Sequence, residues 1–262
     1  MMVTLNLRRQ AAEQQLILTG VDSLNKFDRG TAIETWRGRM VNEHISARVF
    51  ASLIPQMMKA GLDASHLSQV AVMITDELRH GRQCAAVVSA LGGDPCAEIP
   101  ELADVPNHED ASPLEGLLRN VLSISCLSET VAVALIRAEQ QAVAPPEMHT
   151  TLSMILADEV QHARFGWGLL REVSSSLDKD VKNRLSDYLV VAFAHLREHE
   201  LKHLPIDHIP SSAASEVGVC DGRDARTLFF DTVHQVIIPG LEKHGFAAKS
   251  AWQDSMNVGM HH

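Results

Sequence analysis

Apolar residues recur along most of the chain at spacings of three and four, and the strict alternation typical of β-strands is nearly absent. Such spacing places apolar side chains on one face of an α-helix. The pattern therefore predicts an all-α protein. The predicted helices cover residues 31–59, 65–91, 113–142, 146–173, 179–204 and 224–245.

The predicted helix ends carry recognisable signals. Thr31 and Glu34 have the spacing of a capping box before the first helix, and Ser112 and Glu115 have the same spacing before the third. Pro239 lies inside the last predicted helix and should kink or break it, because proline lacks the N–H that the helix needs.

The connections between the first four helices follow a short, long, short order. The middle connection, residues 92–112, has no periodic pattern. This order is typical of a four-helix bundle with one crossover. We expect an N-terminal extension (residues 1–30), a bundle (residues 31–174), and two additional helices (within residues 175–262) that pack on the bundle.

Polar residues interrupt the apolar stripe of each bundle helix near its middle. Every stripe carries one glutamate, and two stripes carry a histidine three residues later. Residues three apart lie on one helix face, so a Glu oxygen and a His nitrogen can reach the same point in the core. The six residues are Glu43, Glu77, His80, Glu129, Glu159 and His162.

Burying four carboxylates without compensation would be prohibitive. Two divalent cations would balance their charge and leave the two imidazoles neutral. Asp76 and Asp158 precede the two Glu-x-x-His motifs. A metal-bound imidazole donates its other N–H to an acceptor, commonly a carboxylate. Because the two aspartates point toward the neighbouring helix, we expect Asp76 to support His162 and Asp158 to support His80.

The spacing alone is a weak signal, since a third Glu-x-x-His occurs at Glu200 and His203. The alternative interpretation is a set of solvated Glu–His pairs on helix surfaces. Two features argue against that alternative: the preceding Asp occurs in both motifs, and the flanking stripe positions are apolar.

The order Glu, Glu-x-x-His, Glu, Glu-x-x-His on four helices resembles the ferritin-like di-iron carboxylate superfamily, over residues 31–174. The resemblance implies a ferritin-like four-helix bundle around two metal ions. It also implies that Glu77 and Glu159 bridge the ions. The remaining ligands would be Glu43 and His80 for one ion, and Glu129 and His162 for the other.

Members of this superfamily include bacterioferritins, rubrerythrins, aldehyde-deformylating oxygenases, arylamine N-oxygenases and manganese catalases, so the motif does not select a reaction. The chain lacks the CxxC pairs of a rubredoxin module. Tyr188 is the only tyrosine and lies off the ligand helices, which disfavours a tyrosyl-radical role. Ile155 stands where the arylamine oxygenases have an additional histidine.

We therefore expect an oxidoreductase that holds two iron ions, or manganese, and activates O₂ to oxidise a small organic substrate with the help of an electron donor. The alternatives are a ferroxidase that handles iron and a dimanganese enzyme that removes peroxide. The additional helices could wall a substrate pocket. We expect O₂ and substrate to approach beside the metals, at Ala47, Phe50, Met73, Ser125, Cys126 and Gly166.

Two further features have competing interpretations. Ala47 and Gly166 could serve only to let helices approach closely. His195, His199 and His203 recur every four residues. They suit either an extra metal site or a polar face near a helix end, and His195, in an apolar stretch, should be the one nearest the core.

Composition narrows the setting. The formal net charge of -10 and the lack of a basic stripe disfavour nucleic-acid binding. The longest apolar runs have about ten residues, too short to span a bilayer, and the start does not resemble a signal peptide. The four cysteines have no CxxC spacing, which favours a cytoplasmic protein. Long amphipathic helices would also suit a homodimer.

Overall fold

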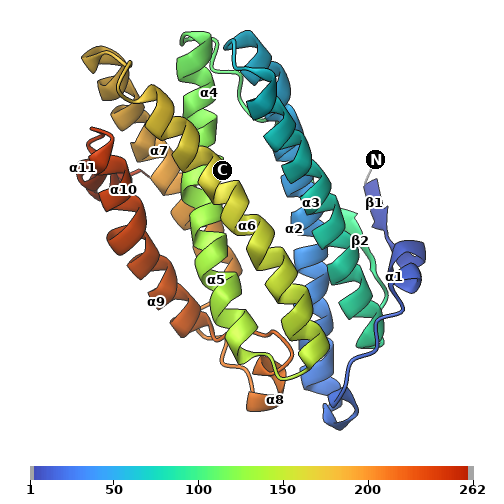
Figure 1. The fold of residues 1–262 in the computed structure, drawn as a ribbon. Coiled ribbons are helices and arrows are strands. Elements are labelled where there is room, and N and C mark those ends of the chain that lie inside the picture. Colours follow the sequence, from blue (N-terminus) through green and yellow to red (C-terminus); the bar gives the residue numbers. More distant parts are fainter. Residues whose placement is uncertain (1–2, 259–262) are drawn as a thin grey trace.

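A computed structural model describes residues 3–258 and is mostly helical, which confirms the all-α prediction (Figure 1). The site is built from four long helical stretches. They are α2 (Lys26–Lys59), α3 (Ala64–Ala90), the continuous run of α4 (Pro113–Val121), the π-helical segment η2 (Leu122–Ser128) and α5 (Glu129–Ala142), and finally α6 (Pro146–Val173).

These four stretches surround a common interior. Helix α2 packs against α3 and α4, and α6 packs against α3, η2 and α5. Short turns make α2 antiparallel to α3 and α5 antiparallel to α6 (Figure 1). The crossover between α3 and α4 returns the chain along the bundle, so α3 and α6 also run antiparallel.

The stripes predicted from the sequence face this interior. Trp36, Phe50 and Leu122 are fully buried, and the glutamate at the middle of each stripe is buried as well. The half-buried members of the stripes are Ile54 and Val173 at outer ends, and Val133 within the third stripe.

The N-terminal region contains a small sheet that the sequence did not predict. Strand β1 (Val3–Asn6) pairs antiparallel with β2 (Cys96–Ile99) from the crossover. Helix α1 (Arg8–Gln14) and the 3₁₀ turn η1 (Val21–Ser23) follow β1. Each strand has only four residues, too few for alternation to be a reliable signal.

The start of α2 corrects one prediction. The helix begins at Lys26, because the Asn25 side chain accepts the backbone N–H of Asp28 and caps the first turn. The Thr31 hydroxyl bonds to the carbonyl of Phe27 inside the helix, so the predicted capping box at Thr31 is wrong. The expected boundary after residue 30 falls within α2. The cap at Ser112, which accepts the backbone N–H of Glu115, is confirmed.

The C-terminal region has more helices than the two that were predicted. Helix α7 (Lys179–His203) matches the prediction. The predicted last helix is α9 (Gly222–Thr232), the π-helical turn η3 (Val233–Ile237) and α10 (Ile238–Lys243), with Pro239 in the first turn of α10. The short helices α8 (Ser212–Ser215) and α11 (Ala248–Ser255) were missed.

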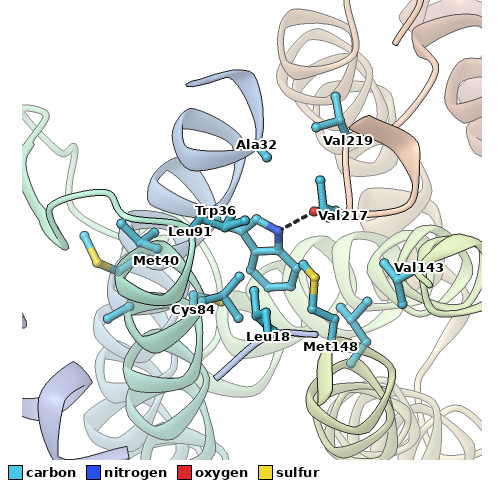
Figure 2. Close-up of a cluster of buried hydrophobic side chains, with 14 of the residues drawn as sticks. Leu18, Ala32, Trp36, Met40, Cys84, Leu91, Val143, Met148, Val217 and Val219 are labelled. Atoms are coloured by element: carbon cyan, nitrogen blue, oxygen red, sulfur yellow. Dashed lines mark hydrogen bonds between the residues drawn. The ribbon is translucent and has the colours of Figure 1, made fainter. Parts of the chain in front are cut away.

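Two apolar clusters fasten these additional segments to the bundle. In the first, the Trp36 indole N–H donates to the carbonyl of Val217 at 2.8 Å, and Met148 and Val143 pack nearby (Figure 2).

In the second apolar cluster, Leu122 of η2 packs with Phe193 of α7 and Phe229 of α9. The loop after α8 and helices α7 and α9 therefore complete the core around the bundle.

By length and composition alone, the helical run Pro113–Ala142 could cross a membrane. This corrects the expectation that every apolar stretch is too short. Core helices of soluble proteins pass the same test, so the finding is weak evidence. The run packs against α2, α6 and α7 and carries the buried carboxylate of Glu129.

Candidate metal centre

The structure brings together all six residues that the stripes singled out. They form two groups of four, and within each group the potential ligand atoms lie within 4.8 Å of one another. Both groups contain Glu77 and Glu159. The first group adds Glu43 and His80, and the second adds Glu129 and His162.

The two histidines turn their Nδ1 atoms toward the shared glutamates. His162 Nδ1 lies 3.1 Å from Glu77 Oε1 and 3.1 Å from Glu159 Oε2. His80 Nδ1 lies 3.3 Å from Glu159 Oε1 and 3.4 Å from Glu43 Oε2. The two oxygens of Glu159 thus face different histidines, as a bridging carboxylate requires. Glu77 reaches His80 less closely, at 4.0 Å.

The opposite nitrogens have the partners that the sequence predicted. His80 Nε2 lies 3.1 Å from Asp158 Oδ2, and His162 Nε2 lies 3.4 Å from Asp76 Oδ2. Each aspartate comes from the helix opposite its histidine. When Nε2–H donates to the carboxylate, Nδ1 is left bare toward the interior.

Arg79 links the two supporting aspartates. Its Nη2 donates to Asp76 Oδ1 and to Asp158 Oδ2, both at 2.7 Å. Its position three residues after Asp76 allows the first contact. The second contact depends on how α3 and α6 lie together, and no local sequence pattern indicates it.

Burial and neighbouring carboxylates disfavour the charged forms of Glu77 and Glu129. Burial, and then the charges of Glu159 and Glu43, raise the pKa of Glu77 well above its usual value. Burial and then Glu159 do the same to the pKa of Glu129.

The pKa values of His80 and Glu159 shift in the directions that favour the charged form of each group. Burial works to lower the pKa of His80, but contacts with Glu159 and Glu43 raise it to about 11. Burial works to raise the pKa of Glu159, yet hydrogen bonds from His162 and His80 lower it. The buried carboxylates therefore need positive charge close by, which a pair of divalent ions would supply.

The residues fit a pair of divalent metal ions. His80 Nδ1 is buried and, among residues 3–258, has no hydrogen-bond partner of good geometry, although carboxylates of Glu43, Glu77 and Glu159 face it. A metal ion would satisfy this nitrogen. Four carboxylates and two neutral imidazoles also balance two divalent charges, and this donor set suits iron or manganese. The buried Glu/His groups could therefore hold metal.

No family model matches the chain, and no curated protein matches it. The interpretation of this centre rests on its own geometry.

The predicted pocket residues Ala47, Phe50, Met73, Ser125, Cys126 and Gly166 are all buried. The Phe50 ring lies edge-on to the His162 ring, with centroids 5.4 Å apart. A Cβ on Gly166 would lie 2.5 Å from Ser125 Cβ, so this glycine lets α6 approach η2 closely. That contact supports the packing interpretation of Gly166, and a substrate pocket in this layer stays a prediction.

The sequence analysis missed the π-helical segment η2, which ends immediately before Glu129. One signal was present: the stripe offered two adjacent residues, Ser125 and Cys126, at a position where the other helices offered one. Both are buried. The wider π turn accommodates an extra residue on the inner face.

The histidines of α7 lie apart from this centre. His195 is exposed, which corrects the expectation that it faces the core. His199 and His203 are exposed as well, with ring centroids 4.5 Å apart. Among the described residues, none of the three belongs to a group with metal-binding geometry.

Proposed function

We propose that this protein is a ferritin-like di-iron oxidoreductase that uses O₂ to oxidise a small organic substrate. The observation that carries the proposal is the pair of four-residue groups sharing Glu77 and Glu159. Two shared carboxylates between two histidine-bearing sides are the donor arrangement that a dinuclear centre needs.

The described side chains have distinct roles in this proposal. Glu43 and His80 would hold one ion, Glu129 and His162 the other, and Glu77 and Glu159 both. A reduced iron pair supplies electrons and Lewis acidity for reaction with O₂.

The protein supplies orientation and shielding around that pair. Asp76 and Asp158 fix the two imidazoles, and Arg79 fixes both aspartates. The buried Phe50 ring, edge-on to His162, shields that histidine from water.

Two observations favour organic oxidation over iron storage. Helices α7, α9 and α11 extend the core beyond the bundle, an elaboration that iron oxidation alone does not require. The ligands are also deeply buried, with Glu43 and Glu129 only 6% and 7% exposed, which suits a resident metal pair. The electron donor, the homodimer and the cytoplasmic location remain predictions.

Metal loading tests the proposal directly. Purified protein is loaded anaerobically with Fe(II), desalted and analysed for metal, and O₂ consumption is then followed with an electrode and a spectrometer. We expect two iron ions per chain and rapid O₂ consumption without mineral formation. Retention of less than one ion per chain would refute the dinuclear centre. Continued uptake of iron into a mineral would favour a ferroxidase, and peroxide removal by the manganese form would favour a dimanganese enzyme.

A matched pair of variants makes this experiment specific. Glu159→Ala removes a shared glutamate, and Glu200→Ala removes the glutamate of the third Glu-x-x-His, which lies outside the centre. We expect Glu159→Ala to lose metal and O₂ consumption, and Glu200→Ala to retain both.

A further inference from the structure

A groove of about 700 Å³ runs along α3 and α6. Its size lies within the range of small-molecule sites. His162 and Asp76 contribute to its wall. His162 is fully buried, with Nδ1 facing the shared glutamates and Nε2 facing Asp76, so its metal-facing nitrogen is directed away from Asp76, which also lines the groove.

The middle of the groove is apolar. Val72 and Met73 line it from α3, and Phe165 and Leu169 line it from α6. Val72 is 58% exposed, although it lies in the middle of a long helix. Met73, Phe165 and Leu169 are buried, so Val72 supplies most of the exposed apolar surface that a ligand in the groove would cover.

Three carboxylates and three arginines line the groove, but they are not joined in three separate pairs. The carboxylates of Asp76 and Asp158 are both held by Arg79. The third carboxylate, Glu172, lies 3.1 Å from His66 Nε2.

Two arginines of the lining have no such partner. Across residues 3–258, neither Arg164 nor Arg171 has a carboxylate within 4.0 Å. The groove therefore offers two guanidinium groups that no described carboxylate engages, although its three arginines and three carboxylates balance in number.

Gly168 keeps the space between these arginines open. It stands four residues after Arg164 and three before Arg171, so all three lie on one face of α6. A Cβ built on Gly168 meets no atom within 4 Å, whereas a Cβ on Gly166 meets Ser125 at 2.5 Å. Packing between helices explains Gly166 but does not explain Gly168.

We propose that the α3–α6 groove is a binding site for a small amphipathic anion. Its carboxylate head pairs with Arg164 and Arg171, and its apolar body covers Val72, Met73, Phe165 and Leu169. Guanidinium groups suit a carboxylate head because they offer it paired donors. Of the six predicted metal ligands only His162 lies in the groove wall, and it is fully buried, so the site stands independently of the proposed redox chemistry.

Laurate is a suitable probe, titrated calorimetrically into the full-length, metal-loaded protein below its micellar concentration. Dodecyltrimethylammonium tests the same tail with opposite charge, and acetate tests the head alone. We expect one laurate to bind per chain, with at least tenfold weaker binding of the other two probes. Failure of laurate to saturate one site, or equal binding of the cationic probe, would overturn the proposal.

Glycine substitutions locate the site. Gly168→Leu places a side chain in the groove, beginning with a Cβ that meets no atom within 4 Å, and should weaken laurate binding at least tenfold. Gly38→Leu is the matched control, because a Cβ on Gly38 of α2 also meets nothing within 4 Å and lies outside the groove. Undiminished laurate binding to Gly168→Leu would place the ligand elsewhere and overturn the assignment.

Charge substitutions and metal analysis complete the test. The double variant Arg164→Gln, Arg171→Gln should weaken laurate binding at least tenfold and leave metal content unchanged; unaltered affinity would overturn the role of the arginines. Metal content separates the two proposals. Binding of two metal ions without binding of laurate would overturn only the groove proposal. Binding of laurate without binding of metal would overturn only the proposed di-iron function.

Discussion

The centre has two sides, one with Glu43 and His80 and the other with Glu129 and His162. Both sides begin from the same sequence pattern but are built on different backbones. On the first side, Glu43 belongs to the regular helix α2. On the second side, Glu129 is the first residue after the π-helical segment η2. The two glutamates are nevertheless buried to nearly the same extent, 6% and 7% exposed. Equivalent positions in the site thus arise from different local backbones.

The two Glu-x-x-His motifs differ most at the residue before histidine. Arg79 precedes His80 and holds both supporting aspartates, whereas Gln161 precedes His162 and is exposed. One arginine suffices because antiparallel α3 and α6 bring Asp76 and Asp158 to the same side of the histidines. Two nearly identical motifs therefore differ in how their aspartates are held, because only the motif of α3 supplies an arginine for that purpose.

The largest expected effect is on the number of bound metal ions, and it distinguishes the glutamates shared by both groups from those that belong to one group. Glu159→Ala should abolish binding of both metal ions, since Glu159 belongs to both groups. Glu129→Ala and Glu43→Ala should each lose one ion and retain the other, on opposite sides of the centre. Metal analysis after desalting gives the stoichiometry. Retention of two ions by Glu159→Ala would contradict its shared role.

The next effect concerns the ion pair that joins the two sides outside the centre. Arg39 of α2 donates to the Glu139 carboxylate of α5 at 2.9 Å, and the Glu139 side chain is only 2% exposed. Glu139→Gln should lower the free energy of unfolding by about 3 kcal/mol, because it leaves a largely buried guanidinium without its counter-charge. Urea denaturation measures this change.

An apolar replacement provides the control for that ion pair. The double variant Arg39→Met, Glu139→Leu removes both charges together and should recover most of the lost stability. Equal stability of Glu139→Gln and the unaltered protein would show that the pair does not hold the two sides together.

The third effect concerns the residues that hold Asp76 and Asp158, and it compares Arg79 with Gln161 at the matching position. Arg79→Gln should weaken the binding of both metal ions about tenfold, since loss of a hydrogen-bonded outer partner commonly costs 10–100-fold in affinity. Gln161→Ala, at the matching position, should change affinity less than about twofold, because the support on that side does not use it. Competition with a chelator measures both. Equal losses of metal affinity in the two variants would mean that Arg79 has no special role in holding the two aspartates.

The smallest effect concerns the helix starts. Asp63 caps α3 by accepting the backbone N–H groups of Ser65 and His66, whereas neutral Ser112 caps α4. The hydrogen bond from the Ser65 side chain, followed by those two backbone N–H groups, lowers the pKa of Asp63 from 3.8 to about 2. The ionised cap therefore stabilises the fold above pH 3.8, and this contribution is lost as the pH falls toward 2.

Replacement of Asp63 by the residue type found at the other cap tests this small effect. The thermal midpoints of Asp63→Ser and the unaltered protein should differ by a constant amount near neutral pH. The difference should then narrow between pH 3.8 and about 2. A pH-independent difference would show that the charge of Asp63 does not contribute.

Several parts of the fold could be predicted because their signals are local. Helical periodicity marked α3, α6 and α7 closely, and the cap at Ser112 marked the start of α4. The start of α2 was placed five residues late, because Thr31 and Glu34 imitate a capping box inside the helix. The strands β1 and β2 escaped detection because each is short and its partner lies far away in the sequence.

The sequence by itself determined which side chains meet in the centre. Charge and periodicity place four glutamates and two histidines inward, and buried carboxylates need compensating cations. It also determined the exchange of Asp76 and Asp158 between opposite helices.

Only the tertiary structure decided how that centre is supported and approached. The link from Arg79 to Asp158, the π-helical turn before Glu129 and the open groove at Gly168 depend on the spacing between helices. That spacing is set by the packing of many distant side chains, and no single motif encodes it.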